Sequence, residues 1–418
     1  MIKQLDQNKL RQSTVLLTLG SVLLGATHSY GLGFLVPNQD AFAIGRGNAV
    51  AATADNPSAI YYNPAGITQI PGTVIQFGDL NYLGINVHYN SPNGASQANT
   101  KFEIVPIPEL YFTHSISNSP VPISYGLGIY APFGLGVKWP QQSSLRTEAL
   151  NSRLYYITIN PVIAVEPVHT LSFAVGPTFN YAKIGFNRGL TSAFDYYEFK
   201  GDAFNFGLTA GLMWKPISQL SFGLDYKLAT DMNFSGTSTY GPGNGAVFST
   251  GTTGDVHFPQ ILSGGISYRP TQNWNFEGDV DYINWNTLGN VNLHGTKNIF
   301  GQNLILALNW HDSWQFKFGA TRYFGDGWYA SAGYFYSTST TSSEDYTAAV
   351  PDAGLHVGSI GVGRNCEHWH WSLATQLIGG TRSVPADPGN TNPFTGATSG
   401  GRYSFLVPTL AFSVGYAF

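Results

Sequence analysis

From about residue 73 onward, apolar and polar residues alternate along the chain with a period of two. Residues 170–183, 219–229 and 273–283 show the pattern most clearly. Successive side chains of a β-strand point to opposite faces of the sheet. One face of the 273–283 segment would therefore carry Trp274, Phe276, Val280 and Tyr282, and the other Asn275, Glu277, Asp279 and Asp281. The pattern predicts strands with one face in hydrocarbon and the other in a mostly polar interior.

The alternating runs can be counted. They begin near residues 73, 102, 123, 153, 170, 202, 219, 256, 273, 314, 327, 354, 368 and 402. Fourteen is an even number, as expected for a closed single-chain bacterial barrel. The last run places Leu406, Leu410, Phe412, Val414, Tyr416 and Phe418 on one face and ends on the aromatic Phe418, which is typical of the closing strand of an outer-membrane barrel.

The connections between runs predict the two ends of the barrel. Residues 214–218 and 324–327 are expected to form short periplasmic turns. Longer stretches rich in Gly, Ser, Thr and Asn suit extracellular loops at 236–255, 286–303, 338–353 and 380–401. Aromatic residues near run ends are expected in the interfacial girdles, namely Trp139, Trp285, Trp310, Trp328 and Tyr334.

Composition removes several alternatives. Charged residues make up 11% of the chain, against roughly 25% in soluble domains, which disfavours a soluble β-sandwich. After the N-terminus no segment approaches 18 apolar residues, so the mature chain is expected to have no helical span. The net charge is −4 and no basic cluster is present, so we expect no nucleic-acid partner. The single cysteine, Cys366, excludes an internal disulfide and a cysteine-rich zinc site.

The first seventy residues do not alternate. Residues 1–29 combine a basic start with an apolar stretch at 13–27 and are predicted to be a secretory signal, with an anchor helix as the alternative. Residues 30–70 are rich in small residues, with a short helix expected over Ala49–Ala54. A barrel of about fourteen strands is wider than its own side chains fill. We therefore expect residues 30–70 to form a plug within a barrel of residues 71–418, rather than a disordered tail.

Specific motifs in this N-terminal segment resemble the hatch of the FadL-type transporters of long-chain fatty acids and hydrocarbons. They are Gly33-Phe34, Gly45-Arg46-Gly47, Ala54-Asp55 and Asn63-Pro64-Ala65-Gly66. Further matches follow in order along the chain at 130–135, Asn160-Pro161, 224–227, Trp285 and 351–353. The resemblance covers essentially the whole mature chain. It implies a monomeric, all-β, 14-stranded antiparallel transmembrane β-barrel in the bacterial outer membrane, with Asn63, Pro64 and Ala65 in the hatch.

The resemblance also implies cargo-binding positions. A fatty acid needs an apolar slot and a cation for its carboxylate. The family's first cation falls nearest Phe186, and Arg188, on the same strand face, is its candidate substitute; the second aligns with His311, with Lys317 as the fallback. Phe34 is a further candidate ligand contact, and Phe133, Leu135 and Trp139 are expected to form an outer capture surface. The cargo is expected to be a fatty acid or a neutral aromatic hydrocarbon, with outer-membrane lipids as the other partner.

Pro132 and Gly134 lie within the predicted third strand. Proline removes a ladder donor and is tolerated at edges, ends or bulges. In a closed barrel it predicts a local break, which is either a simple bulge or, as the resemblance implies, a lateral opening into the membrane. The prediction is passive uptake by pocket binding, hatch rearrangement and lateral release. A general porin for small polar solutes is the alternative.

An enzyme is the remaining class. His368, His370 and Ser372 lie two residues apart and so share a strand face, which would suit a hydrolase. Their neighbours Trp369 and Trp371 favour a lumen-lining role instead. We expect no catalytic activity, no cofactor and no metal.

Overall fold

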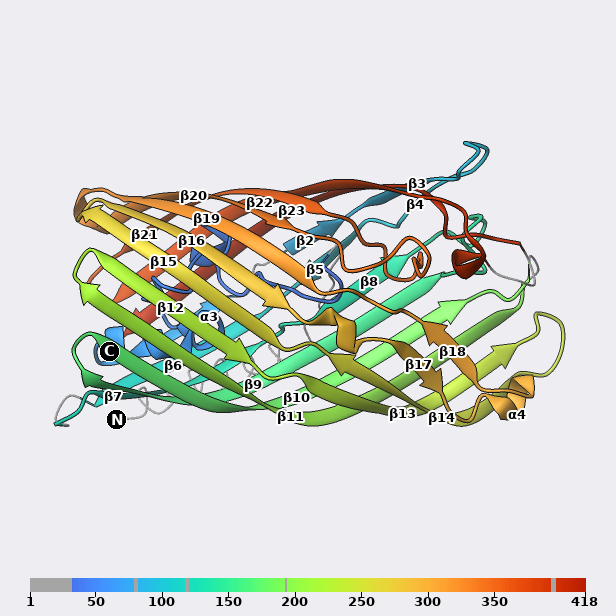
Figure 1. Ribbon diagram of the computed structural model, residues 1–418, viewed down its shortest axis with the longest axis horizontal. Helices are drawn as coiled ribbons and strands as arrows, with labels where there is room; N and C mark the ends of the chain where they lie inside the picture. Colours follow the sequence, from blue (N-terminus) through green and yellow to red (C-terminus); the bar gives the residue numbers. More distant parts are fainter. Residues whose placement is uncertain (1–31, 79–81, 117–119, 192–193, 392–395) are drawn as a thin grey trace, which may run out of the picture.

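The computed structural model describes residues 32–78, 82–116, 120–191, 194–391 and 396–418. The chain forms a long barrel of steeply tilted antiparallel strands (Figure 1). The first part of the sheet runs through β1 (Thr73–Gly78), β2 (Tyr82–Ile85), β3 (Val87–Asn90), β4 (Gln97–Asn99), β5 (Glu103–Pro106), β6 (Glu109–Ile116), β7 (Ile123–Tyr130), β8 (Gly134–Lys138), β9 (Asn151–Val168), β10 (Leu171–Arg188), β11 (Tyr196–Ile217), β12 (Leu220–Lys227) and β13 (Thr230–Gly241). The second part runs through β14 (Phe248–Phe258), β15 (Ile261–Thr271), β16 (Trp274–Ile283), β19 (Ser313–Tyr323), β20 (Trp328–Ser337), β21 (Leu355–Asn365), β22 (Trp369–Val384) and β23 (Gly401–Ala417).

The sheet closes on itself. Strand β1 pairs with the last strand, β23, on one side, with Val74 opposite Ala417, and with β6 on the other. Over the described residues the strands combine into fourteen antiparallel passes, because several passes are split into two named strands. The predicted fold class is therefore confirmed. The predicted starts of the runs lie within two residues of a strand start, except those near 202 and 256, where β11 begins at Tyr196 and β14 at Phe248.

The two faces of the strands have the polarity that the alternation predicts. On β16, Phe276 and Val280 are exposed on the outside of the barrel, whereas Glu277 and Asp279 are buried in its interior. On β23, Leu406 and Leu410 are likewise exposed, at 54% and 49%. An apolar exterior of this kind is stable in hydrocarbon.

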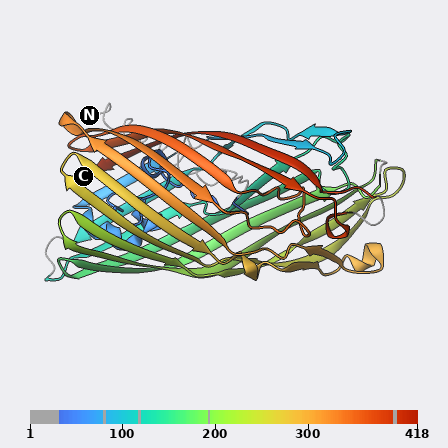
Figure 2. The same cartoon turned by 45° about the horizontal axis from the view of Figure 1, so that its top comes forward.

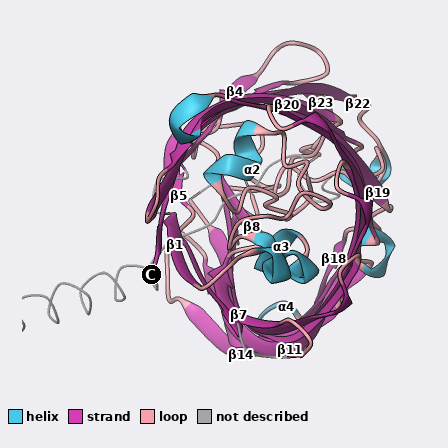
Figure 3. Cartoon of the chain, turned by 90° about the vertical axis from the view of Figure 1, so that its left-hand side faces the viewer, coloured by secondary structure: helices cyan, strands magenta, loops and turns pink. Residues whose placement is uncertain are grey.

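The N-terminal segment 32–72 lies across the lumen. Viewed along the barrel, α2 (Ala41–Gly45) and α3 (Ala59–Tyr62) lie inside the ring of strands (Figure 3). The segment also contains the 3-10 helix η1 (Pro64–Gln69), which contacts β9, β10 and β11. Helix α2 contacts strands β20 to β23, so the segment reaches opposite parts of the wall. The predicted helix over Ala49–Ala54 is wrong: these residues form turns, because most of their N–H groups bind side chains of the wall.

The connections differ at the two ends of the barrel, which we call the turn end and the loop end. Short turns lie at the turn end, together with the C-terminus (Figures 1 and 2). The turn predicted at 214–218 is shifted, since β11 runs to Ile217, whereas 324–327 does form a turn that contains η3 (Gly325–Gly327). At the loop end, much of 236–255 is a strand hairpin, and β22 extends to Val384. The other elements there are η2 (Trp285–Thr287), β17 (Asn290–Leu293), α4 (Lys297–Phe300), β18 (Leu304–Ala307) and η4 (Pro388–Asn390).

Three of the five residues predicted for the aromatic girdles lie elsewhere. Trp139, Trp285 and Trp310 are each no more than 2% exposed and belong to the interior core. Trp328 and Tyr334 are 40% and 42% exposed on the barrel surface. Position near a run end fixes the height of a residue along the barrel but not whether it points inward. In the part of the chain that the structure describes, no helix is both long and apolar enough to cross a membrane.

Candidate binding cavity and the segment that closes it

A cavity of about 360 Å³ lies inside the barrel toward the loop end. Ligand pockets for small molecules commonly have volumes of about 300–1,000 Å³, so this space fits one small apolar guest. Its wall comes from β8, β9, β10 and β14, from β17 and β18, and from the loops at 345–350 and 389–391. More than half of the lining residues are aliphatic or aromatic, namely Phe34, Leu135, Leu154, Ile184, Phe186, Val256, Val291, Ile305, Leu306, Ala307, Leu308, Tyr346, Ala349 and Val350.

Phe34 places the N-terminal segment in the wall of this cavity. Its ring centroid lies 4.9 Å from that of Trp310 and 5.9 Å from that of Trp285. Phe133 and Phe258 extend the same aromatic cluster, with their centroids 4.9 Å apart. The preceding Gly33 has φ of +63°, and a Cβ there would lie 2.6 Å from the Trp310 ring. Glycine is therefore required for Phe34 to reach this cluster.

Four charged side chains line the cavity, and two of them, Arg153 and Asp345, already have partners. The other two are Glu148 and Arg188. Glu148 belongs to the loop between β8 and β9, and Arg188 is the last residue of β10. Burial raises the pKa of Glu148 to about 7, although Arg188 and a hydrogen bond from Ser399 oppose the rise. Neither Glu148 Oε1 nor Arg188 Nε has a hydrogen-bond partner. The cavity therefore combines an apolar body with a carboxyl group and a guanidinium group that each keep one polar atom without a partner.

The third pass is interrupted where the sequence predicts a break. Strand β7 ends at Tyr130 and β8 begins at Gly134. Between them, the N-terminal segment supplies the hydrogen bonds: the Val36 N–H donates to the Pro132 carbonyl (2.8 Å), and the Gly134 N–H donates to the Phe34 carbonyl (2.8 Å). The Gln39 side chain binds both backbone groups of Ala131. The same few residues thus form part of the cavity wall and fill the gap in the strand.

Farther toward the turn end, carboxylates of β16 hold the N-terminal segment. Asp279 Oδ2 accepts from the N–H groups of Val50 (2.8 Å) and Ala51 (3.0 Å). Glu277 Oε1 accepts from the Ala52 N–H (2.6 Å), and Glu277 Oε2 forms a fully buried ion pair with Arg46 (3.1 Å). We call Arg46, the turn 50–53, Glu277 and Asp279 the hatch network. The alternation on β16 brings both carboxylates to the lumen face.

The Asn63-Pro64-Ala65 motif anchors the segment to a different part of the wall. The Asn63 side chain donates to the Ala51 carbonyl (2.8 Å) and to the Leu212 carbonyl of β11 (3.1 Å), and it accepts from the Ala65 N–H. All three residues are buried. The Asn63 amide therefore joins two turns of the N-terminal segment to one barrel strand.

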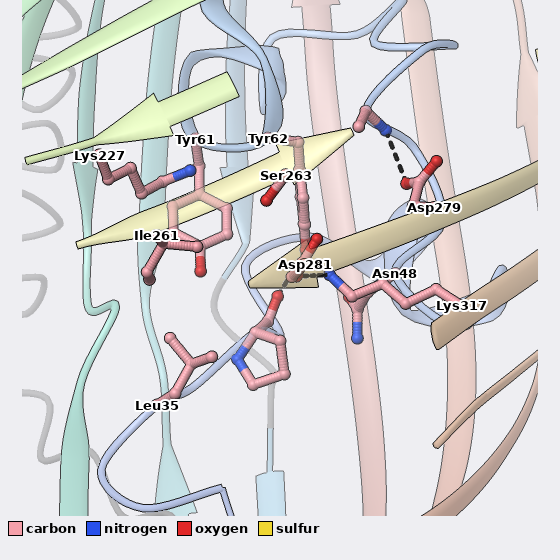
Figure 4. Close-up of a pocket in the computed structure, with 12 residues that line it drawn as sticks. Leu35, Asn48, Tyr61, Tyr62, Lys227, Ile261, Ser263, Asp279, Asp281 and Lys317 are labelled. Atoms are coloured by element: carbon pink, nitrogen blue, oxygen red, sulfur yellow. Dashed lines mark hydrogen bonds and ion pairs between the residues drawn. The ribbon is translucent and has the colours of Figure 1, made fainter. Parts of the chain in front are cut away.

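A second, much smaller space of about 20 Å³ lies beside the hatch network (Figure 4). Two lysines line it, and each is already paired: Lys317 with Asp281, and Lys227 with Asp225. The Lys227 ammonium also lies 4.6 Å from the ring centroid of Tyr61. This space holds about one water molecule and has no room for cargo.

The structure separates the residues that the sequence suggested for cargo. Phe34, Leu135 and Arg188 line the 360 Å³ cavity. Phe133 lies in the aromatic cluster behind it. Lys317 lines the small space instead, and His311 is exposed, with its backbone N–H donating to Thr340. Trp139 is buried and donates from Nε1 to the Ala348 carbonyl (2.9 Å), so it does not belong to an exposed outer surface.

His370 of β22 and His368, which precedes that strand, do not form a catalytic arrangement with Ser372. His370 contacts Gln76 (3.2 Å), and the Ser372 hydroxyl bonds to Tyr329 (2.5 Å). His368 is exposed and contacts the Ala417 carbonyl. A nucleophile needs a base within hydrogen-bond reach. Each of these side chains has a different partner.

Sequence reasoning missed several residues of the site. Glu148 and the 345–350 loop carry no periodic signal, because a loop side chain reaches the cavity only through tertiary packing. Phe258 and Tyr156 were predicted only as ordinary strand positions, yet their rings lie 4.9 Å apart in the aromatic cluster. Arg46 carried a usable signal: it is a lone cation between two glycines in a segment of low charge.

Comparison with known proteins identifies related chains. A protein of Neisseria meningitidis serogroup B, named as an outer membrane protein, is 28% identical over 144 residues, which span 32% of this chain and 30% of that protein. The long-chain fatty acid transport protein of Escherichia coli O6:H1 is 21% identical over 378 residues, covering 79% of this chain and 83% of that protein.

Solved structures share the fold. A Pseudomonas aeruginosa FadL homologue has a TM-score of 0.80 at 16% identity, over 92% of this chain and all of that one. The P. putida toluene transporter TodX has a TM-score of 0.72 at 16% identity, over 91% of this chain and 98% of that one. The profile of the family described as outer membrane protein transport protein (OMPP1/FadL/TodX) matches residues 22–372. The chain therefore belongs to this family of outer-membrane transport proteins.

Proposed function

We propose that this protein carries hydrophobic molecules, such as fatty acids or aromatic hydrocarbons, inward across the bacterial outer membrane without an energy source. The cargo enters from the loop end and occupies the 360 Å³ cavity. The N-terminal segment, acting as a hatch, then rearranges. The cargo leaves sideways into the membrane through the interruption at residues 131–133. In this scheme residues 1–29 direct export and 30–70 form the hatch.

One observation carries the proposal. Residues 34–39 contribute Phe34 to the cavity wall and also fill the gap between β7 and β8. A displacement of these residues would therefore open the floor of the cavity and the side of the barrel together. An apolar guest leaving by this route would avoid the aqueous periplasm, where its hydration is unfavourable. The same segment lies across the lumen, which disfavours an open, water-filled porin.

A reversible cross-link tests the scheme. Leu35 and Phe133 form an antiparallel bridge with hydrogen bonds on both sides of it. Such pairs have Cα atoms about 4.5 Å apart, within the range for a disulfide. In a Cys366→Ser background, Leu35→Cys with Phe133→Cys should abolish uptake of radiolabelled oleate and toluene when oxidised and restore it when reduced. Recovery on reduction shows that the variant is folded.

Two controls complete the test. The single-cysteine variants should respond to neither oxidant nor reductant. Replacing Pro132 and Gly134 with valine should lower uptake and leave folding intact, because a continuous third pass would close the gap. Undiminished uptake by the fully cross-linked protein would rule out both the hatch movement and the lateral exit.

Conductance in planar bilayers distinguishes the proposed transporter from a general porin. A porin predicts a steady, large current.

A further inference from the structure

Three side chains that line the cavity have a buried polar atom that nothing in the described chain satisfies. They are Oε1 of Glu148, Nε of Arg188 and the hydroxyl of Ser152, and the first two belong to charged groups. A buried polar atom without a partner costs stability, so native proteins contain few of them. Fourteen such side-chain atoms occur among the described residues, and two of them belong to charged side chains that line one ligand-sized cavity, which points to a polar group of the guest.

The two atoms are complementary to each other, yet they do not pair. Glu148 and Arg188 are close enough for Arg188 to lower the pKa of the carboxyl, but they form no ion pair. The Arg188 guanidinium instead lies over the Phe186 ring, 5.9 Å from its centroid. The carboxylate offers an acceptor and the guanidinium offers a donor. The guest group that satisfies both is one that donates and accepts at a single atom.

The two other charged side chains that line the cavity, Arg153 and Asp345, already have partners, and so does the nearby Arg146. Arg153 forms an ion pair with Glu103 (3.2 Å), and Arg146 with Asp195 (3.4 Å). Asp345 accepts from Asn309 and Ser342. Phenols also lie near these two groups: Tyr89 and Tyr403 are close to Glu148, Tyr197 is close to Arg188, and Tyr346 lines the cavity. The recognition of a head group therefore depends on Glu148 and Arg188.

A hydroxyl has the required chemistry: its hydrogen donates and its oxygen accepts. A carboxylate is acceptor-only, so it would leave Glu148 unsatisfied and place two negative charges together. A hydrocarbon would leave both polar atoms without partners. We propose that the cavity selects amphiphiles with a neutral hydroxyl head, such as medium-chain alkanols or alkylphenols, over the carboxylates and hydrocarbons of equal length. This specificity rests on the proposed function of the cavity.

The test uses the full chain in lipid nanodiscs and three ligands of equal length. The ligands 1-decanol, decanoate and decane compete with a fluorescent naphthylamine probe at pH 8.5, where Glu148 is ionised. We expect the Kd of 1-decanol to be at least tenfold lower than that of the other two. Glu148→Leu and Arg188→Leu should each remove this preference. Glu148→Gln keeps an acceptor and loses the charge, so it should retain decanol binding and strengthen decanoate binding about tenfold.

A matched control and a second measurement guard against misfolding of the variants. Glu198→Leu removes a carboxylate on β11 that is paired with Lys200 and does not line the cavity, and it should leave all three affinities unchanged. The second measurement uses the unmodified protein and the ligand decyl sulfonate, which remains anionic at every pH used. Its affinity should rise as the pH falls from 8.5 to 5.5, because Glu148 becomes neutral.

The outcomes distinguish this inference from the proposed function. Equal affinities for the three ligands would overturn the head-group selection while leaving hydrophobic transport in place. Tightest binding of decanoate at pH 8.5, lost in Arg188→Leu, would show a carboxylate site and likewise overturn the inference alone. Failure of every ligand to displace the probe would count against the proposed function itself.

Discussion

The two halves of the barrel interior differ in how they pair buried charge. In the hatch network, the carboxylates of β16 bind the protein's own backbone N–H groups and Arg46. In the cavity, Glu148 and Arg188 lie close together but leave polar atoms unpaired. A buried charge is costly unless it is paired and hydrogen-bonded. The turn half thus pairs most of its buried charge within the chain, although Asp279 Oδ1 has no partner among the described residues, whereas in the loop half Glu148 and Arg188 form no ion pair with each other.

The largest effect is expected from breaking the hatch network. Arg46→Met leaves Glu277 buried without its cation, which should destabilise the protein by about 3–5 kcal/mol. The shift of the urea midpoint in nanodiscs measures this, and planar-bilayer recordings should show conductance that the parent lacks. The control is Arg269→Met, because Arg269 pairs with Asp55 at the surface (2.6 Å) and such pairs contribute about 0–1 kcal/mol. Equal midpoints for the two variants would contradict the buried role of Arg46.

The pH dependence of stability sharpens the other side of the comparison. Burial raises the pKa of Glu148 from 4.5 to about 7, so the folded state binds the proton more tightly than the unfolded state. The stability that this group contributes is fully present below pH 4.5 and is lost as the pH rises through 7, by roughly 3 kcal/mol at most. Urea midpoints at pH 5 and pH 8 should therefore differ less in Glu148→Gln than in the parent. An identical pH dependence in both proteins would show that the Glu148 side chain is exposed to solvent and not buried.

A smaller effect should follow from crowding the contact between the segment and the wall. A Cβ at Gly223 would lie 2.0 Å from the Ala51 carbonyl oxygen, so Gly223→Val should cost about 1–3 kcal/mol. A Cβ at Gly379, a strand glycine of β22, meets nothing within 4 Å, and Gly379→Val should be tolerated. Limited proteolysis would detect displacement of the N-terminal segment in the first variant. Equal protection in the two would mean that this contact does not hold the segment.

The smallest effect is expected at His311. Its side chain is exposed and does not line the cavity. His311→Ala should change stability by no more than about 0.5 kcal/mol and leave the Kd for hydrophobic ligands unaltered. A clear loss of binding would show that the cargo contacts the outer edge of the barrel before it reaches the cavity.

The parts of the site that the sequence predicted are those with a local signature. The break at Pro132 follows from the missing N–H of proline, and the strand is interrupted there. The inward direction of Glu277 and Asp279 follows from alternation. The inward position of Trp285 and Trp310 does not, because both lie outside regular strands, where the period of two ends. The sequence also did not decide which of Arg188, His311 and Lys317 would be the cation that binds the cargo. Of these three residues, only Arg188 lines the 360 Å³ cavity.

The sequence by itself determined that this is a barrel with an apolar outside and a polar inside. Strand alternation is a property of adjacent residues, so a linear pattern contains it. Only the tertiary structure decided what the inward side chains meet. Closure of the sheet and folding of the loops bring Phe34 against Trp310, Arg46 against Glu277, and Glu148 beside Arg188. These contacts join residues far apart in the chain, and no local preference of either partner specifies them.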